Sequence, residues 1–157
     1  MKIILMVTGR TRDEALEKLT KRYTARIGHY VPFELMELPD VRTTRSTTEA
    51  SQKQAEGAQM LRNIAPADCV VLLDEHGRQM TSREFAAFID RKMSTLPRNL
   101  IFVVGGPYGF SEEVRARADA MLSLSLMTFS HEMVRPFFAE QIYRAMTILR
   151  GEPYHHD

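Results

Sequence analysis

Four short apolar runs recur along the first two thirds of the chain, and each has about the length of a β-strand. The runs are Ile3 to Val7, Phe33 to Leu38, Cys69 to Leu73, and Leu100 to Val104. Between them, apolar residues return every three or four positions, as on one face of a helix. Strands that are separated by helix-length segments pair in parallel through right-handed crossovers. The pattern therefore predicts an α/β fold whose mostly parallel sheet is flanked by helices on both faces.

Local signals place several boundaries of the helices. Thr81 and Glu84 have the spacing of a capping box, in which each side chain binds the other residue's backbone N–H. Ser111 precedes two glutamates, and acidic residues suit the electropositive start of a helix. The last helix is predicted from about Val134 to Arg150, because Pro136 is tolerated only in a first turn.

The composition is that of one ordinary globular domain spanning residues 1–157, with 44% hydrophobic and 26% charged residues. No apolar run approaches the roughly 18 residues of a membrane-spanning helix, and the first residues lack the pattern of a signal peptide. We therefore expect a cytoplasmic protein that has no membrane partner. The single cysteine, Cys69, lies in an apolar run, which favours inert packing over a reactive thiol.

The C-terminal half carries the most distinctive residues. Gly105-Gly106-Pro107-Tyr108-Gly109-Phe110 directly follows the last apolar run. It fits neither the dinucleotide fingerprint nor the P-loop, so it is either a plain turn or a loop that cradles a ligand against its backbone. Leu122 to Phe129 begins with alternating apolar and hydroxyl residues, which predicts a half-exposed fifth strand leading directly into a loop. Ligands of such sheets bind at the carboxyl ends of the strands, which directs attention to the residues after Leu73 and Val104.

Charge and histidine content add two weaker hypotheses. The net charge is only +1, but basic residues are densest near the N-terminus, at Arg10, Arg12, Lys18, Lys21, Arg22 and Arg26. This group is either a solvated helix face or a patch that binds an RNA backbone. His155 and His156 are adjacent on the tail without partners at fixed spacing, which makes a poor metal site, and no metal is expected.

Taken together in order and spacing, these motifs resemble the ribosomal RNA large subunit methyltransferase H family, which belongs to the SPOUT class. The resemblance covers the whole chain. Its motifs are the opening Lys2 to Leu5, the glycine-rich turn Gly105 to Gly109, Leu122 to Phe129 followed by Ser130-His131, Arg135, the stretch Glu140 to Ala145, and Pro153-Tyr154-His155. It implies that the C-terminal part of the sheet is tied into a trefoil knot and that the protein is a homodimer. Knots are rare, and no periodicity predicts one.

The resemblance also implies an activity. Members of the family use S-adenosylmethionine to methylate N3 of a pseudouridine in a hairpin loop of 23S ribosomal RNA, within the assembled 70S ribosome. The residues expected to contact the cofactor are Leu73, Gly105, Leu124, Ser125, Leu126, Met127, Thr128 and Phe129. The candidates that act on the RNA base or on its N3 proton are Arg144, His131, Tyr154 and His155.

Two alternatives remain at this point. The protein could be a SPOUT methyltransferase with another RNA target, or it could be a ribosome-binding module without catalytic activity. Saturable cofactor binding separates the second alternative from the enzymes, because an adaptor needs no cofactor.

Overall fold

The computed structural model describes residues 1–95 and 97–157, and its centre is a five-stranded sheet in which every ladder is parallel. The strand order is β2-β1-β4-β3-β5. The strands are β1 (Ile3–Thr8), β2 (Phe33–Leu38), β3 (Cys69–Arg78), β4 (Leu100–Val104) and β5 (Ala120–Leu122). The helices are α1 (Glu14–Ile27), α2 (Glu49–Arg62), α3 (Ser82–Thr95), α4 (Glu112–Arg117) and α5 (Val134–Leu149).

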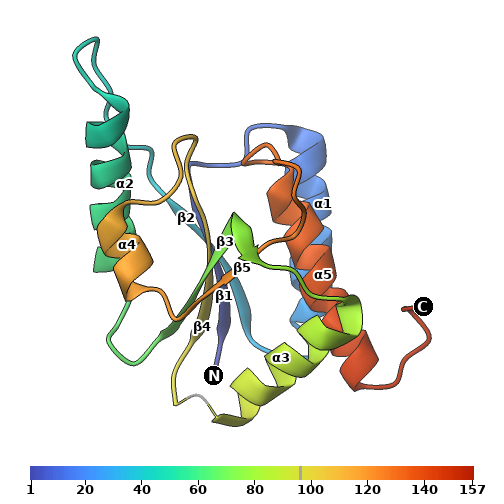
Figure 1. Cartoon of the computed structure of the whole chain (residues 1–157). Helices are drawn as coiled ribbons and strands as arrows, with labels where there is room; N and C mark the ends of the chain where they lie inside the picture. Colours follow the sequence, from blue (N-terminus) through green and yellow to red (C-terminus); the bar gives the residue numbers. More distant parts are fainter. Residues whose placement is uncertain (96) are drawn as a thin grey trace.

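Helices cover both faces of the sheet, as the sequence predicts. Helices α1, α3 and α5 lie on one face, and α2 and α4 lie on the other (Figure 1). Successive side chains of a strand point to opposite faces, so Ile3, Leu5 and Val7 enter the core beneath α5. Ile4 and Met6 enter the core beneath α2. The continuous apolar runs are thus explained by burial on both sides.

Most predicted boundaries are confirmed. Strands β2 and β4 match the predicted runs, and β1 is one residue longer than its run. Thr81 Oγ1 accepts from the backbone N–H of Glu84, whose carboxylate accepts from the N–H of Thr81. Ser111 Oγ accepts from the N–H of Val114 at the start of α4. Helix α5 begins at Val134, which places Pro136 in the first turn.

Two strand predictions need correction. Strand β3 continues past Leu73 to Arg78, across an irregularity in its pairing with β5. The fifth strand lies at Ala120–Leu122, and Leu122 to Phe129 is loop after its first residue. The hydroxyls expected to alternate along a strand bond to nearby backbone instead. Ser123 Oγ donates to the carbonyl of Ser125 at 3.0 Å, and Ser125 Oγ accepts from the N–H of Met127 at 3.0 Å. These local bonds compete with a sheet ladder.

Cys69 is buried in β3, and desolvation by burial raises the pKa of its thiol. The expectation of inert packing is therefore supported. Within residues 1–95 and 97–157, we find no helix with the length and apolar character to cross a membrane.

Arg135 is fully buried in the first turn of α5 and joins this helix to the end of β1. Its guanidinium donates to the carbonyls of Thr8 and Gly9 at 3.0 and 2.9 Å and to Thr11 Oγ1 at 3.0 Å. Its Nε donates to the carbonyl of His131 at 3.0 Å. Burial lowers the pKa of Arg135, although the nearby carboxylates counteract this effect. The guanidinium therefore joins the segment after β1 to the loop that leads into α5.

Arg135→Ala removes these four hydrogen bonds and leaves buried carbonyls without partners. We expect the free energy of unfolding to fall by about 3 to 5 kcal/mol, measured by urea denaturation at fixed protein concentration. Arg91→Ala on the exposed side of α3 is the matched control, with an expected change below about 0.5 kcal/mol. Equal stability of the two variants would contradict the role given to the buried guanidinium.

Candidate functional site

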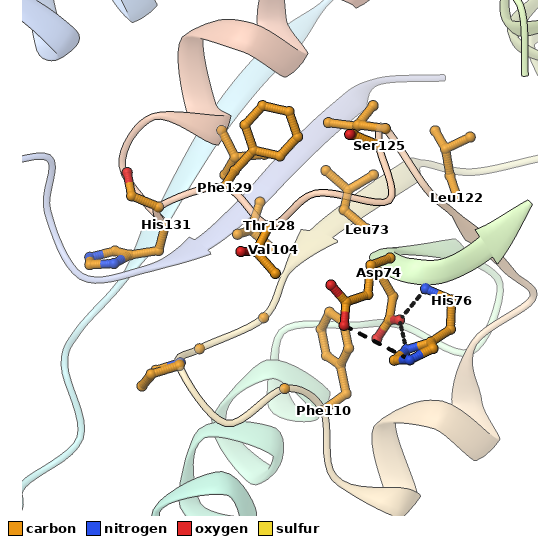
Figure 2. Close-up of a pocket in the computed structure, with 18 of the residues that line it drawn as sticks. Leu73, Asp74, His76, Val104, Phe110, Leu122, Ser125, Thr128, Phe129 and His131 are labelled. Atoms are coloured by element: carbon orange, nitrogen blue, oxygen red, sulfur yellow. Dashed lines mark hydrogen bonds and ion pairs between the residues drawn. The ribbon is translucent and has the colours of Figure 1, made fainter. Parts of the chain in front are cut away.

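A cavity of about 700 Å³ opens at the carboxyl ends of β3, β4 and β5. Its lining comes from three chain segments and from Arg115 of α4: residues 73–76 within β3, residues 104–110 at the end of β4 and beyond it, and residues 122, 124–125, 127–131 and 134 from the end of β5 to the start of α5. In Figure 2, Leu122, Ser125 and Phe129 of the last segment face Asp74, His76 and Phe110 across the cavity. The parallel sheet thus brings together residues that are up to about sixty positions apart in the sequence.

The glycine-rich turn forms one wall of this cavity. A Cβ on Gly105 would lie 3.1 Å from Cζ of Phe110, which is tighter than ordinary packing. Gly109 has a φ of +80°, a conformation that other residues rarely adopt, and the turn is closed by a bridge between Gly106 and Gly109. The backbone of this turn thus faces a cavity, which is the position that a ligand-cradling loop would need.

Asp74 forms the polar end of the cavity, and its side chain is only 9% exposed. Its Oδ1 accepts from the backbone N–H and from Nδ1 of His76, both at 2.8 Å. Its Oδ2 accepts from Arg115 at 3.0 Å, an ion pair between β3 and α4. Burial raises the pKa of Asp74, but the hydrogen bonds from His76 and Arg115 together outweigh it and hold the pKa below the usual value.

Seven of the eight expected cofactor contacts line the cavity: Leu73, Gly105, Leu124, Ser125, Met127, Thr128 and Phe129. Leu126 is the exception, because its side chain is 77% exposed and lies outside the lining. The turn that Ser125 forms with the N–H of Met127 points the residue between them outward. The Leu126 side chain therefore does not line this cavity, and its expected contact with the cofactor stays a prediction.

The four residues expected to act on the base divide into two groups. His131 lines the cavity, and its carbonyl is fixed by Arg135. Arg144, Tyr154 and His155 do not line it. Arg144 follows Val134 by ten residues of α5, which is about 15 Å along a helix. In Figure 1 the tail beyond α5 lies at the opposite end of this helix from the loop before it.

The second group forms a tight polar cluster on its own chain. Oε1 of Glu140 accepts from Arg144 Nη2 at 2.6 Å and from the hydroxyl of Tyr154 at 2.9 Å. Arg144 Nη1 lies 3.1 Å from His155 Nδ1, and Nε2 of this histidine lies 3.0 Å from Asp157. Burial, together with hydrogen bonding to Tyr23 and Glu140, raises the pKa of Tyr154 further above its usual value.

Sequence reasoning missed Glu140 and Asp74. Glu140 could have been found, because a carboxylate four residues before Arg144 lies on the same helix face. Asp74 follows the predicted strand directly, but its partner Arg115 is 41 residues away, and no local pattern joins them. Among the described residues there is no group of three or more His, Cys, Asp or Glu placed to hold a metal ion.

Comparison with known proteins shows the family to which this chain belongs. A family model described as "Predicted SPOUT methyltransferase" matches residues 1–155. The chain belongs to the SPOUT methyltransferase family. The trefoil knot that the resemblance implies is consistent with this membership, and the parallel sheet with helices on both faces confirms the rest of the expected fold class.

Curated relatives match this SPOUT chain over its full length. Proteins named "Ribosomal RNA large subunit methyltransferase H" from Porphyromonas gingivalis and Parabacteroides distasonis are each 50% identical over 157 residues, which is 100% of both chains. A protein of the same name from Christiangramia forsetii is 52% identical over 156 residues, or 99% of each chain.

Solved structures are more distant. The SpoU methyltransferase AviRb from Streptomyces viridochromogenes, described in complex with AdoMet, is 10% identical and has a TM-score of 0.46. The match covers 96% of this chain and 61% of that one. A probable methylase family protein from Haemophilus influenzae has a TM-score of 0.47 at 15% identity, with 96% and 66% covered.

Asp74→Asn tests the polar end of the cavity. Because the folded-state pKa of Asp74 is lowered, its ionised form stabilises the fold above the unfolded value of 3.8, and this contribution is lost as pH falls through the folded pKa. We expect Asp74→Asn to lower the free energy of unfolding by about 1 to 3 kcal/mol at neutral pH. Below about pH 4 the free energies of unfolding of the variant and of the unsubstituted protein should converge. Urea denaturation at several pH values measures both effects. Asp90→Asn, on an exposed position of α3, should show neither.

Proposed function

We propose that the protein is an S-adenosylmethionine-dependent methyltransferase that modifies N3 of a pseudouridine in a hairpin loop of 23S ribosomal RNA. The observation that carries this proposal is the cavity at the carboxyl edge of the sheet, between the glycine-rich turn and the loop after β5. It occurs in a SPOUT family member whose full-length relatives are named as large-subunit ribosomal RNA methyltransferases. Location and family thus point to the same chemistry.

The lining of the cavity fits this cofactor. Its volume lies within the roughly 300 to 1,000 Å³ of small-molecule sites. Leu73, Val104 and Phe129 offer an apolar surface for an adenine ring, and the backbone of Gly105 admits close approach. Asp74 and Glu75 provide carboxylates at the polar end, where the α-ammonium group of the cofactor's methionine part would be stabilised. When bound, the cofactor supplies an electrophilic methyl group on a sulfonium centre.

The protein's own task is to position the base and to manage one proton. The bond from N3 to the methyl carbon forms as the carbon–sulfur bond breaks, and the N3 proton leaves to a base or to water. His131 lies at the cavity and can accept this proton. Arg144 can stabilise negative charge on an imide oxygen, while Tyr154 and His155 can stack on the unpaired base.

We further propose that a second copy of the chain completes the site. Arg144, Tyr154 and His155 lie at the far end of α5 from the cavity, so one chain does not bring both groups together. Large apolar side chains are exposed beside the cavity: Leu126, Met127, Phe129, Met133 and Phe137. Contiguous apolar patches of this kind mark protein interfaces. A homodimer would cover this patch and place one chain's Arg144 near the other chain's cavity.

The assembled 70S ribosome is the proposed substrate. With a net charge of +1, the chain has little general affinity for bare RNA, which is bound mainly through phosphate neutralisation. The basic residues around Arg10, Arg12 and α1 would contact RNA locally, and the shape of the particle would supply the remaining specificity.

Methyl transfer from labelled S-adenosylmethionine to 70S ribosomes that lack this modification tests the proposal. Mass spectrometry then maps the modified nucleotide. N3-methylpseudouridine in 23S RNA is the expected product. A label at another nucleotide or in transfer RNA would support a SPOUT enzyme with a different target, and absence of saturable cofactor binding would support a non-catalytic ribosome-binding module.

Arg144→Ala should slow methylation of these ribosomes by at least about 10-fold, which corresponds to about 1.4 kcal/mol of transition-state stabilisation. The cofactor dissociation constant should stay unchanged, because Arg144 does not line the cavity of its own chain and is proposed to act on the base of the partner's site. Arg150→Ala, at the exposed end of the same helix, is the control and should retain full turnover. A normal rate for Arg144→Ala would return this residue to a structural role.

A mixed dimer tests whether the site is shared between copies. Gly105→Val pushes a branched side chain against Phe110 and should abolish cofactor binding, while Arg144 stays intact. Neither a Gly105→Val dimer nor an Arg144→Ala dimer should methylate at the normal rate. A heterodimer of the two, purified through different tags, should regain activity because one cavity and one Arg144 remain. Activity as low as in the parent variants would contradict the shared site.

A further inference from the structure

A second cavity of about 310 Å³ adjoins the first, on the other side of the glycine-rich turn. It lies where β1 and β4 end and is bounded by α2 and by the residues around Arg135. Both cavities are lined by Val104, Gly105, Gly106, Pro107 and His131. Because two residues of this common wall lack side chains, a ligand in one cavity can closely approach a ligand in the other.

The chemistry of this second cavity centres on Glu56. Glu56 lies in α2 and is 95% buried, yet no cationic side chain within residues 1–95 and 97–157 forms a salt bridge with it. Its Oε1 accepts from Gln52 Nε2 at 3.0 Å, one turn earlier on the same helix face. Its Oε2 lies against Gly106, in the space that a Cβ there would occupy. Buried carboxylates are normally paired, so this one suits a ligand that brings its own N–H donor.

Glu56 and Gln52 together present an acceptor beside a donor. Glu56 offers a carboxylate oxygen, and the Gln52 amide carries a second N–H besides the one directed at Glu56. This pair complements a base edge on which an N–H neighbours a carbonyl. At the cavity, Arg10 and Arg12 are exposed, and the only ion pair of Arg12 within the described chain is a solvent-exposed one with Asp40 at 3.6 Å. Both guanidiniums are thus available to the phosphates that flank an unpaired nucleotide.

We propose that this cavity binds the pseudouridine itself and that Glu56 determines its selection over uridine. Pseudouridine is joined to ribose through carbon, so its N1 keeps a hydrogen next to the C2 carbonyl, whereas N1 of uridine is bonded to the sugar. Glu56 accepts from N1–H, and Gln52 donates to the C2 oxygen. N3 lies on the other side of this carbonyl and stays free to face the common wall. This inference rests on the proposed function, and it adds that the N1–H group is the feature by which the base is recognised.

Glu56→Gln is the direct test, with two preparations of 70S ribosomes that carry either pseudouridine or uridine at the target position. The glutamine oxygen can still accept from Gln52, which turns the amide N–H₂ toward N1–H and sets donor against donor. We expect the ratio of kcat/KM for pseudouridine over uridine to fall by at least about 10-fold. The cofactor dissociation constant should stay within about twofold of the original value. The melting temperature should change by no more than about a few degrees. A purely structural role would not change the ratio.

Two further variants complete the experiment. Glu49→Gln, at an exposed position of α2 outside the cavity, should leave the ratio unchanged. Gln52→Ala changes a partly exposed position that tolerates truncation. It should lower kcat/KM on pseudouridine ribosomes by about 10-fold and leave cofactor affinity unchanged. This variant tests the cavity even if Glu56→Gln unfolds. An unchanged ratio in folded Glu56→Gln, or full activity of Gln52→Ala, would overturn this inference while leaving the proposed function intact. Failure of the original protein to methylate either preparation would instead overturn the proposed function.

Discussion

The structure around both cavities depends on one buried guanidinium. Arg135 has its charge inside the protein, where its donors satisfy carbonyls of Thr8, Gly9 and His131. These carbonyls belong to the end of β1 and to the loop before α5, which the hydrophobic core alone would leave free to move apart. An unpaired charge in such a position would be strongly destabilising, so the surrounding backbone has little freedom to rearrange. The position of His131 beside both cavities follows from this constraint.

In the proposed reaction the two cavities divide the work of methyl transfer, one taking the cofactor and the other the base. Parallel strands run toward one edge, so residues 73–76 of β3 meet there with the turn after β4 and the loop after β5. Glycines 105 and 106 keep the wall between the cavities thin. On one side Asp74 and Arg115 form a paired polar end, while on the other Glu56 is buried without a cationic partner among the described residues. The first cavity therefore has a preformed ion pair, whereas in our proposal the base completes the second.

In a single chain, Arg144, Tyr154 and His155 are held away from the first cavity. Glu140 binds both Arg144 and Tyr154 through one carboxylate oxygen, and Asp157 ties the tail to Arg83 and His155. These bonds hold the tail against α5 and α3 in the single chain, which would lower the entropy cost of using it in the proposed reaction. The proposed homodimer gives this preorganised cluster a cavity to act on, and it gives the exposed apolar side chains around Met127 and Phe137 a surface to pack against.

The sequence by itself determined the local structure well, because apolar periodicity, caps and proline positions act over a few residues. It located β2 and β4, the capping box at Thr81, and the start of α5, and the family resemblance located seven residues of the first cavity. Only the tertiary structure decided the strand order, the burial of Arg135, the loop conformation after Leu122, and the distance of Arg144 from the cavity. These features depend on contacts between residues far apart in the chain, such as Asp74 with Arg115, and no periodic pattern records such contacts.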